Sequence, residues 1–406
     1  MAERVLMRNF DLENSYTLAA YRASGGYTAW DTARGMPPEA ITDAVKKSNL
    51  RGLGGAGFPT GAKWSFIPKN HTGPVYLVIN ADEGEPGTFK DRYLLERDPH
   101  ALIEGMLIAA RAIRSALGFV YIRGEYVQPW RRFNAAVKEA YEAGLLGKGF
   151  DIVVHRGAGA YICGEETGLL SSLEGKKGWP KIKPPFPAIK GAFGAPTIVN
   201  NVETICCVPP IISRGAEWFA GLGTKTQGGT RMYSVSGRVK KPAVYEESVS
   251  ITLRQLIERA GGVSGTGRLK AVVPGGGSAA ILTASEIDVP MDVDGLKTAG
   301  TMIGSAGVVV MDESVSIPEA LLVLARFYAH ESCGQCTPCR ESTGWIYKMV
   351  HRIVDGHGKK DDLDTILDVA KRGGGTTICA FYDGAIGPYL SYIEKFRSEF
   401  EALCRG

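Results

Sequence analysis

The chain lacks the long apolar runs that membrane spans and secretion signals require. No stretch of about 18 uninterrupted apolar residues occurs. The nearest approach, residues 106–122, is interrupted by Arg111 and Arg114. The first residues have neither a cationic start nor an apolar core, so no signal peptide is predicted. We therefore expect a soluble protein with no direct membrane insertion.

Excess charge of either sign is also scarce. The formal net charge is +4 over 406 residues, and no long basic tract occurs. Proteins that bind nucleic acid neutralise its phosphates with clustered lysines and arginines, so nucleic acid is not an expected partner. Hydrophobic residues make up 44% of the chain. That fraction is enough for the cores of roughly two to four domains.

Cysteine is infrequent, and half of it falls into one pattern. The chain has 8 cysteines, a usage that fits metal binding in a reducing compartment better than a disulfide framework. Four of them have no ligand spacing and are interpreted as ordinary thiols: Cys163, Cys206, Cys207 and Cys404.

The other four cysteines predict an iron–sulfur site. Cys333, Cys336 and Cys339 follow one another at three-residue spacing, and Cys379 lies further on, between two predicted helices. Four thiolates with one from a distant segment are a known ligand set of a [4Fe–4S] cluster. A four-cysteine zinc site is the main alternative, but it usually consists of two separate Cys-x-x-Cys pairs. Thiols packed in a core would explain one or two of the cysteines but not their spacing.

The region from 74 to 175 has the alternation of an α/β fold. Short apolar runs alternate with helical patterns: strands at 75–79, 119–122 and 152–154, and helices at 98–116, 127–143 and up to about 174. This order predicts a parallel, doubly wound sheet. Ligands of such sheets bind beyond the carboxyl ends of the strands.

A glycine-rich loop precedes the first predicted strand. Five of the ten residues from Gly52 to Gly61 are glycine, and they match G-x-G-x-x-G. A helix is predicted before this loop, and Pro59 argues against immediate entry into a helix, so the usual Rossmann turn is not expected. Aromatic residues and a cation lie beside the glycines: Phe58, Lys63, Trp64 and Phe66. They favour a ring system with phosphate over a flexible surface loop.

Polar residues follow the predicted strands. Asn80, Asp82, Glu83 and Glu85 come after the first strand, and a Gly/Glu loop at 157–167 comes after the third. Glu165 and Glu166 would also suit the positive end of a helix dipole, which is a purely structural alternative. Paired amides at Asn200 and Asn201 could read the edge of a polar ring. Lys176 and Lys177 lie in a charged segment and could equally be exposed side chains with no part in binding.

The remainder of the chain divides into two further parts. Residues 230–312 predict a small α+β module, in which the loop of Gly275, Gly276 and Gly277 has no adjacent charge and predicts no chemistry. From Pro318 onward the sequence predicts helices, with Cys379 in a loop between two of them.

Taken together, these segments resemble the NADH-binding flavoprotein subunit of respiratory complex I, the NuoF family. The resemblance covers nearly the whole chain, in order, at Arg51–Gly61, Asn80–Arg92, Gly157–Thr167, Lys183–Pro187, Asn200–Thr204, Cys333–Arg340 and Thr377–Cys379. It implies a Rossmann-like α/β FMN domain, a ubiquitin-like β-grasp module and a C-terminal α-helical bundle with the [4Fe–4S] cluster. The expected boundaries are 1–50 for an N-terminal helical segment, 51–228, 229–315 and 316–406.

The resemblance also implies the site residues. FMN would lie against Gly52, Gly54, Gly55, Gly57, Lys63, Asn80, Asp82, Glu83, Gly164, Glu165, Asn200, Asn201 and Thr204. NADH would contact Phe58, Phe66, Glu85, Tyr161, Glu165, Glu166, Lys183 and Phe186. No side chain is expected to act as catalytic acid or base, because the flavin carries the hydride chemistry. Leu53 departs from the family, which often has arginine there.

The implied activity is hydride transfer from NADH to FMN, followed by single-electron transfer to the [4Fe–4S] cluster. Expected partners are a thioredoxin-like [2Fe–2S] subunit of the NuoE type and a larger multi-cluster subunit of the NuoG type. The expected place is the cytoplasmic side of a membrane-bound complex, in its peripheral arm. A diaphorase subunit of an NAD-linked hydrogenase or formate dehydrogenase is the alternative within this class. A non-catalytic Fe–S or zinc scaffold is the alternative from another class.

Overall fold

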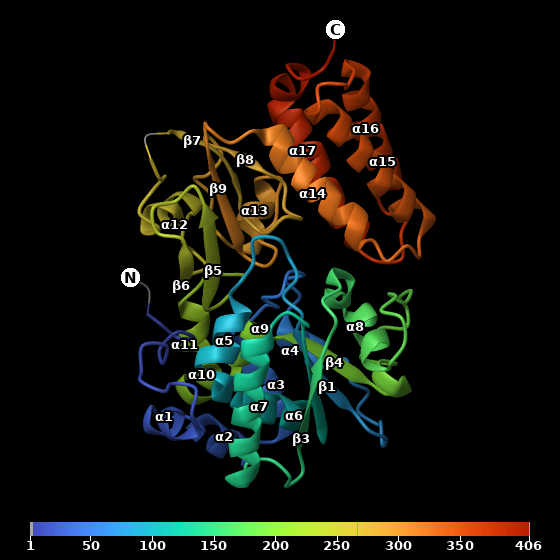
Figure 1. Cartoon of the computed structure of the whole chain (residues 1–406). Coiled ribbons are helices and arrows are strands. Elements are labelled where there is room, and N and C mark those ends of the chain that lie inside the picture. Colours follow the sequence, from blue (N-terminus) through green and yellow to red (C-terminus); the bar gives the residue numbers. More distant parts are fainter. Residues whose placement is uncertain (1–2, 266, 406) are drawn as a thin grey trace.

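The computed structural model describes residues 3–265 and 267–405, which form three parts (Figure 1). An α/β part occupies the lower half of the view. A mixed sheet with its helices lies above it on one side, and a bundle of long helices lies above it on the other. The three-part division of the fold predicted from the sequence is confirmed.

A four-stranded parallel sheet forms the centre of the α/β part. Its strands are β1 (Tyr76–Ala81), β2 (Leu117–Ile122), β3 (Asp151–Arg156) and β4 (Thr197–Asn201). Their order is β3-β2-β1-β4, and every neighbouring pair is parallel. The prediction of a parallel sheet is confirmed. The fourth strand was not predicted, because only Ile198 and Val199 of it are strongly apolar.

Both faces of this sheet are covered, which explains its nearly continuous apolar strands. Leu77 and Ile79 pack into one core, and Val78 between them packs into the core on the opposite face. Helices of this part are α1 (Leu18–Ala23), α2 (Thr28–Ala33), α3 (Pro38–Lys47), α4 (Thr60–Trp64), α5 (Asp91–Arg97), α6 (Pro99–Ile113), α7 (Val127–Glu142), α8 (Glu166–Leu173), α9 (Val202–Cys206), α10 (Val208–Arg214) and α11 (Ala216–Gly221), with short 3₁₀ turns at Tyr161–Gly164 and Ala192–Gly194.

The expectation about Pro59 is wrong. Pro59 is the N-cap of α4, which begins at the next residue. Proline suits the start of a helix, because its fixed φ is already helical and its missing N–H would have had no intrahelical partner. The absence of a usual Rossmann turn is nevertheless confirmed, since the glycine loop joins α3 to α4 and precedes β1.

The second part is a β-grasp module. Its strands are β5 (Thr230–Gly237), β6 (Ala243–Ser248), β7 (Leu269–Val273), β8 (Leu282–Thr283) and β9 (Gly307–Asp312), and its helices are α12 (Leu253–Arg259) and α13 (Val293–Thr298). The strand order is β6-β5-β9-β7-β8, with β5 and β9 parallel at the centre. A hairpin, a helix and a return to the centre of the sheet define the predicted ubiquitin-like topology.

The third part is a bundle of four helices: α14 (Ile317–Glu331), α15 (Thr337–Val354), α16 (Lys360–Gly373) and α17 (Phe381–Glu401). Its core contains aliphatic residues from all four helices and a group of tyrosines on α14 and α17. In the described ranges, each helix is either too short or too polar to cross a bilayer.

Candidate functional site

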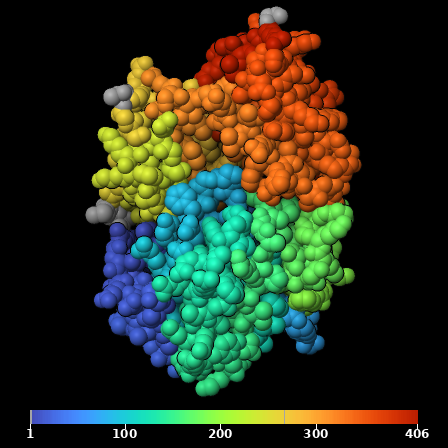
Figure 2. All heavy atoms as spheres, in the orientation of Figure 1, coloured from blue at the N-terminus to red at the C-terminus, as the bar shows by residue number. Residues whose placement is uncertain are grey.

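A cavity of about 620 Å³ lies beyond the carboxyl ends of β1 and β4. The sheet order places β1 between β2 and β4: the chain passes from β1 to β2 on one side and from β3 to β4 on the other side of β1, and a crevice opens at this edge. Figure 2 shows the segment that follows β1, drawn in light blue, at the junction of the three parts. Residues of all three parts line the cavity.

Ten of the predicted site residues line this cavity: Gly54, Gly55, Asn80, Asp82, Glu83, Glu85, Tyr161, Gly164, Glu165 and Asn201. They come from four separate segments, namely the glycine loop, the loop after β1, the loop after β3 and the end of β4. Gly54 approaches closely, since a Cβ added there would lie 2.8 Å from Cβ of Asn201. Larger residues would move the glycine loop away from the sheet.

Asp82 presents an unused acceptor. Its Oδ2 is buried and has no hydrogen-bond partner among the described residues, although Asp82 lines the cavity. Burial raises the pKa of Asp82 to about 7, because a carboxylate loses hydration there. An unpaired buried acceptor is costly unless a ligand donates to it. The residue thus fits a ligand with hydroxyl or N–H donors, such as the ribityl chain or ring of a flavin.

A buried ion-pair network lies in the cavity wall. Lys90 Nζ is 2.8 Å from Asp91 Oδ1 and 2.6 Å from Glu203 Oε2, and all three side chains are almost completely buried. Burial disfavours the ammonium, but the two carboxylates overcome this and raise the pKa of Lys90. Asn201 Nδ2 donates to Asp91 Oδ2 at 2.5 Å. The network therefore fixes the orientation of the Asn201 amide.

A second group of ion pairs joins Glu165 to predicted residues that lie outside the cavity wall. Lys63 Nζ lies 3.1 Å from Glu166, and Lys183 Nζ lies 2.9 Å from both Glu165 and Glu166. Burial works against ionisation, yet Lys63 and Lys183 hold the pKa of Glu166 below its usual value. Glu165 is also the N-cap of α8 and accepts from the backbone of Thr167 and Gly168. Glu165 therefore both caps the start of α8, as the structural alternative predicted, and lines the cavity.

The three predicted aromatic residues lie outside the cavity wall and are exposed. Phe58, Phe66 and Phe186 have exposed fractions of 46%, 51% and 56%. The rings of Phe58 and Phe66 lie 5.8 Å apart. Exposed phenylalanines are costly in water, so rings held in this way are available to a planar ligand.

Four other predicted residues lie behind the cavity wall and support it. Asn200 Oδ1 accepts from Trp64 Nε1 at 2.9 Å, and Thr204 Oγ1 accepts from Leu53 N at 2.8 Å. Both Asn200 and Thr204 are buried and do not line the cavity. The N–H of Gly52 closes the glycine loop by donating to Phe58 O at 2.9 Å, and Gly57 takes a left-handed φ of 64°.

The triple-glycine loop, for which the sequence predicted no chemistry, lies at the cavity. Gly275 and Ser278 line the cavity, and Gly276 packs against Glu85. Other lining residues that sequence reasoning missed are Thr88, Lys90, Asp91, Ala280, Gly300, Thr301, Met302, Gly304, Ser305, Phe381, Asp383, Gly384 and Gly387. The adjacent opposite charges of Lys90 and Asp91 were a detectable signal within the segment after β1. Residues of the other two parts gave no such signal in the sequence, because only tertiary packing brings them to the cavity.

The four predicted cluster ligands come together at one end of the helical bundle. Cys333 lies in the loop after α14, Cys336 is the N-cap of α15, and Cys339 lies in its first turn. Cys379 arrives from the loop between α16 and α17, where Ile378 N donates to Cys336 Sγ at 3.4 Å. A left-handed φ of 77° at Gly334 lets the first loop turn.

Burial affects the protonation of two of these thiols, Cys339 and Cys379. All four are free cysteines. Burial raises the pKa of Cys339 to about 11 and that of Cys379 to about 12. Binding of iron would therefore displace protons from them. Within the part of the chain that the structure describes, no three His, Cys, Asp or Glu side chains converge closely enough for a single metal ion. A polynuclear cluster is larger than one ion, so its ligands stand further apart.

Phe381 connects the cavity with the thiol site. Its side chain lines the cavity, and its backbone donates a hydrogen bond to Cys379. Its ring also lies 5.7 Å from that of Tyr161, another residue of the cavity wall. The two sites therefore adjoin each other.

Profiles of three families match the chain in order. They are the Nuo51 FMN-binding domain at residues 45–210, the SLBB domain at 231–310, and the NADH-ubiquinone oxidoreductase-F iron–sulfur binding region at 319–403. The first covers the cavity edge of the parallel sheet, the second the β-grasp module and the third the four thiols.

Curated relatives are similar over nearly their whole length. The NADH-quinone oxidoreductase F-2 subunit of Rhizobium meliloti is 50% identical, with 99% of this chain and 98% of that protein covered. The NADH-quinone oxidoreductase F subunit of Mycobacterium tuberculosis H37Rv is 49% identical, with 99% and 94% covered. Among solved structures, a chain of an NAD+-reducing [NiFe]-hydrogenase in the H2-reduced state is 36% identical with a TM-score of 0.89; the match covers all of this chain and 67% of that one.

Proposed function

Because the chain belongs to the family of NADH-quinone oxidoreductase F subunits, we propose that the residues gathered at its sheet edge bind FMN and NADH. The chain is an NADH oxidoreductase with FMN and a [4Fe–4S] cluster as cofactors. When bound, FMN takes a hydride from NADH and gives up its electrons singly to the cluster. The protein's own task is to hold, orient and separate these groups.

The flavin is held by backbone and by acceptors. The glycine loop at Gly54 and Gly55 offers backbone at close range, and Asn80, Asp82 and Asn201 offer polar groups from the strand ends. The unpaired Oδ2 of Asp82 is the single observation that carries this proposal, since Asp82 lines the cavity and a ligand bound there could donate to this oxygen. Gly52, Gly57, Lys63, Glu83, Gly164, Glu165, Asn200 and Thr204 complete the proposed flavin site.

The nucleotide is proposed to lie over the flavin, with Phe58, Phe66 and Phe186 beside its adenine. Glu85, Tyr161, Glu165, Glu166 and Lys183 complete this half. Carboxylates close to an anionic ligand weaken its retention, so Glu85 and Glu165 are proposed to limit the affinity for NADH and NAD+. The four thiols of Cys333, Cys336, Cys339 and Cys379 are the proposed cluster ligands.

Glu165→Gln tests this role. Removal of the negative charge should change the affinity for NADH or NAD+ by a few-fold, toward tighter binding, while flavin stays bound. Both affinities can be measured by titration of the flavin absorbance. Glu174→Gln is the matched control, because Glu174 is paired with Lys176 and Lys181 outside the cavity wall. Unchanged binding of both nucleotides in Glu165→Gln would contradict the assignment.

The chain is one subunit of a larger oxidoreductase. We propose a thioredoxin-like [2Fe–2S] subunit of the NuoE type and a multi-cluster subunit of the NuoG type as its direct neighbours. The proposed place is the cytoplasmic side, in the peripheral arm. The proposed domain boundaries remain 1–50, 51–228, 229–315 and 316–406, which agree with breaks between the elements.

The purified chain tests the whole proposal at once. It should be yellow-brown, release flavin fluorescence on denaturation, and oxidise NADH with ferricyanide as acceptor. NADH should also produce the EPR signal of a reduced cluster. A colourless protein with bound zinc would instead support a non-catalytic scaffold.

A diaphorase role in an NAD-linked hydrogenase is the second candidate. The observation that favours it is the 36% identity with the hydrogenase chain. The higher identity with the F subunits, about half of all residues, favours the first candidate. Co-purification of the tagged chain with its natural partners would distinguish a quinone-reducing complex from a hydrogenase.

A further inference from the structure

The loop of Gly275 to Ser278 in the β-grasp module contacts Glu85 directly. Ser278 N donates to Glu85 Oε1 at 2.6 Å, and Tyr161 OH donates to Oε2 at 2.5 Å. Each carboxylate oxygen thus has one donor, the first from the β-grasp module and the second from the α/β part. Glu85 is held between two parts of the molecule.

Glycine is required at position 276 for this contact. A Cβ added to Gly276 would lie 2.4 Å from Cγ and 3.0 Å from Oε1 of Glu85, and the residue has a left-handed φ of 93°. The loop follows the segment after β1 closely, since Gly277 N donates to Pro86 O at 2.9 Å. The absence of a side chain therefore brings this backbone against the carboxylate.

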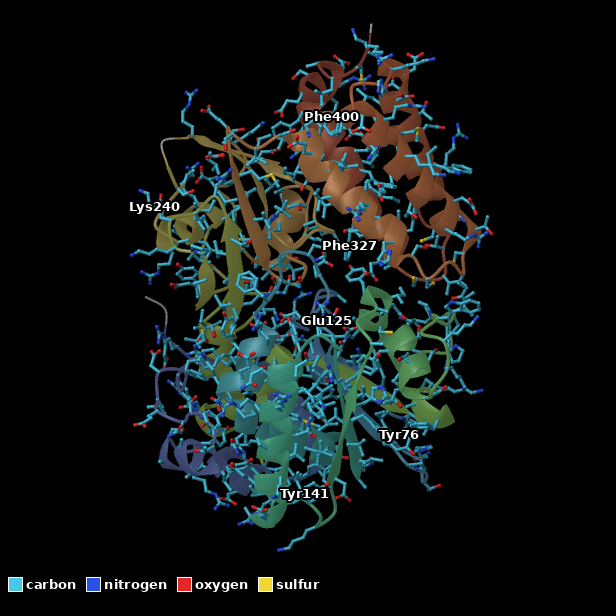
Figure 3. The ribbon with its side chains drawn as sticks, in the orientation of Figure 1. Tyr76, Glu125, Tyr141, Lys240, Phe327 and Phe400 are labelled. Atoms are coloured by element: carbon cyan, nitrogen blue, oxygen red, sulfur yellow. The ribbon has the colours of Figure 1, made fainter. Side chains whose placement is uncertain are left out.

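The same loop reaches the helical bundle. Ser278 Oγ lies 3.0 Å from Tyr328 OH on α14 and 3.3 Å from Tyr161 OH. Phe327, the residue before Tyr328 on α14, lies at the end of the bundle that faces the α/β part (Figure 3). Its ring lies 5.0 Å from that of Tyr161. Ser278 is thus the point where hydroxyl groups from three parts of the molecule meet.

We propose that the Gly275–Ser278 loop positions Glu85 and so sets the affinity of the cavity for the nucleotide. This inference rests on the proposed function, in which Glu85 limits retention of NADH. The β-grasp module then contributes to the nucleotide site, because its residues Gly276 and Ser278 are positioning residues that act through Glu85. Flavin affinity does not depend on them.

Two glycine substitutions test the contact. Gly276→Ala should raise KM for NADH about tenfold, because the displaced carboxylate extends toward the anionic nucleotide. The kcat with ferricyanide and the FMN content should change less than twofold. Gly262→Ala is the matched control: it has a left-handed φ of 77° in the same module, and a Cβ there would meet nothing within 4 Å. Equal KM values in the two variants would overturn the proposal.

A double variant tests whether the effect passes through Glu85. In a Glu85→Ala background the clash is absent, so Gly276→Ala should add less than twofold to KM. Independent, multiplying effects would overturn the proposal. Should Gly276→Ala fail to fold, Ser278→Ala removes the hydroxyl that lies 3.3 Å from Tyr161 OH, the second donor to Glu85. Ser278→Ala should raise KM about threefold, and an unchanged KM would overturn the proposal. If the parent chain retains FMN but does not oxidise NADH, the proposed function fails instead.

Discussion

The thiol site and the cavity differ in how much of the chain each requires. Three of the four thiols come from seven consecutive residues, and the fourth arrives on one loop. The cavity wall draws on all three parts and on at least four segments of the α/β part alone. In the proposed function each thiol is a covalent ligand of the cluster, whereas each cavity residue contributes one weak contact among many. The difference teaches that single changes should abolish the first site but only adjust the second.

Loss of one thiol should have the largest effect. Cys379→Ser should lower cluster content about tenfold or more and remove the EPR signal of the NADH-reduced sample, because a ligand loss costs at least as much as loss of its supporting hydrogen bonds. FMN and NADH should still bind. Cys404→Ser, a free thiol near the end of the chain, is the control. A normal EPR signal in Cys379→Ser would show that Cys379 is not a cluster ligand.

Loss of the unpaired acceptor in the cavity should have a graded effect. Asp82→Asn should weaken FMN binding by about 5- to 100-fold, the equivalent of about 1 to 3 kcal/mol for a buried polar group whose hydrogen bond is lost. Fluorescence titration of the flavin-free protein with FMN measures this. Asp98→Asn provides the comparison, since Asp98 is also buried with one unpaired carboxylate oxygen, Oδ1, but lies outside the cavity wall. An equal loss of affinity in both variants would show a general effect of burial.

The same carboxyl should make flavin-free protein less stable as pH rises. The folded chain holds a proton on Asp82 up to about pH 7. The unfolded chain loses it near pH 4, so the free energy of unfolding falls between these values. Asp82→Asn should reduce this fall by on the order of 2 kcal/mol, measured by urea unfolding at pH 5 and 8. Asp288→Asn should leave the fall unchanged, because pairing with Arg254 lowers the pKa of Asp288.

The smallest effect is expected from a single hydrogen bond between the segment after α8 and the cluster loop. Trp179 Nε1 donates to Cys333 O at 3.2 Å and joins the segment after α8 to the cluster loop. Trp179→Phe should keep the cluster but about double the rate of iron loss to a chelator, since one exposed hydrogen bond contributes about 1 kcal/mol or less. Trp218→Phe, in α11 of the α/β part, should not change the rate. A rate equal to that of the parent chain would show that the bridge does not support the cluster.

Prediction from the sequence succeeded where neighbouring residues decide the structure. Short apolar runs between helical patterns predicted three strands of the parallel sheet, helical patterns predicted the bundle, and cysteine spacing predicted the thiol site. Prediction failed at Pro59, where a rule for helix interiors was applied to a helix start. It also failed at β4, whose apolar stretch is too short to stand out without its neighbour β1.

The sequence alone determined the type of each part and most of the polar residues at the sheet edge, because periodicity, glycine content and thiol spacing are local properties. Only the tertiary structure decided which of these residues face the cavity and which stand behind it, as Asn201 and Asn200 do. It also decided that the triple-glycine loop meets Glu85. Contacts between segments 193 residues apart depend on how whole layers pack, and no local pattern encodes that distance.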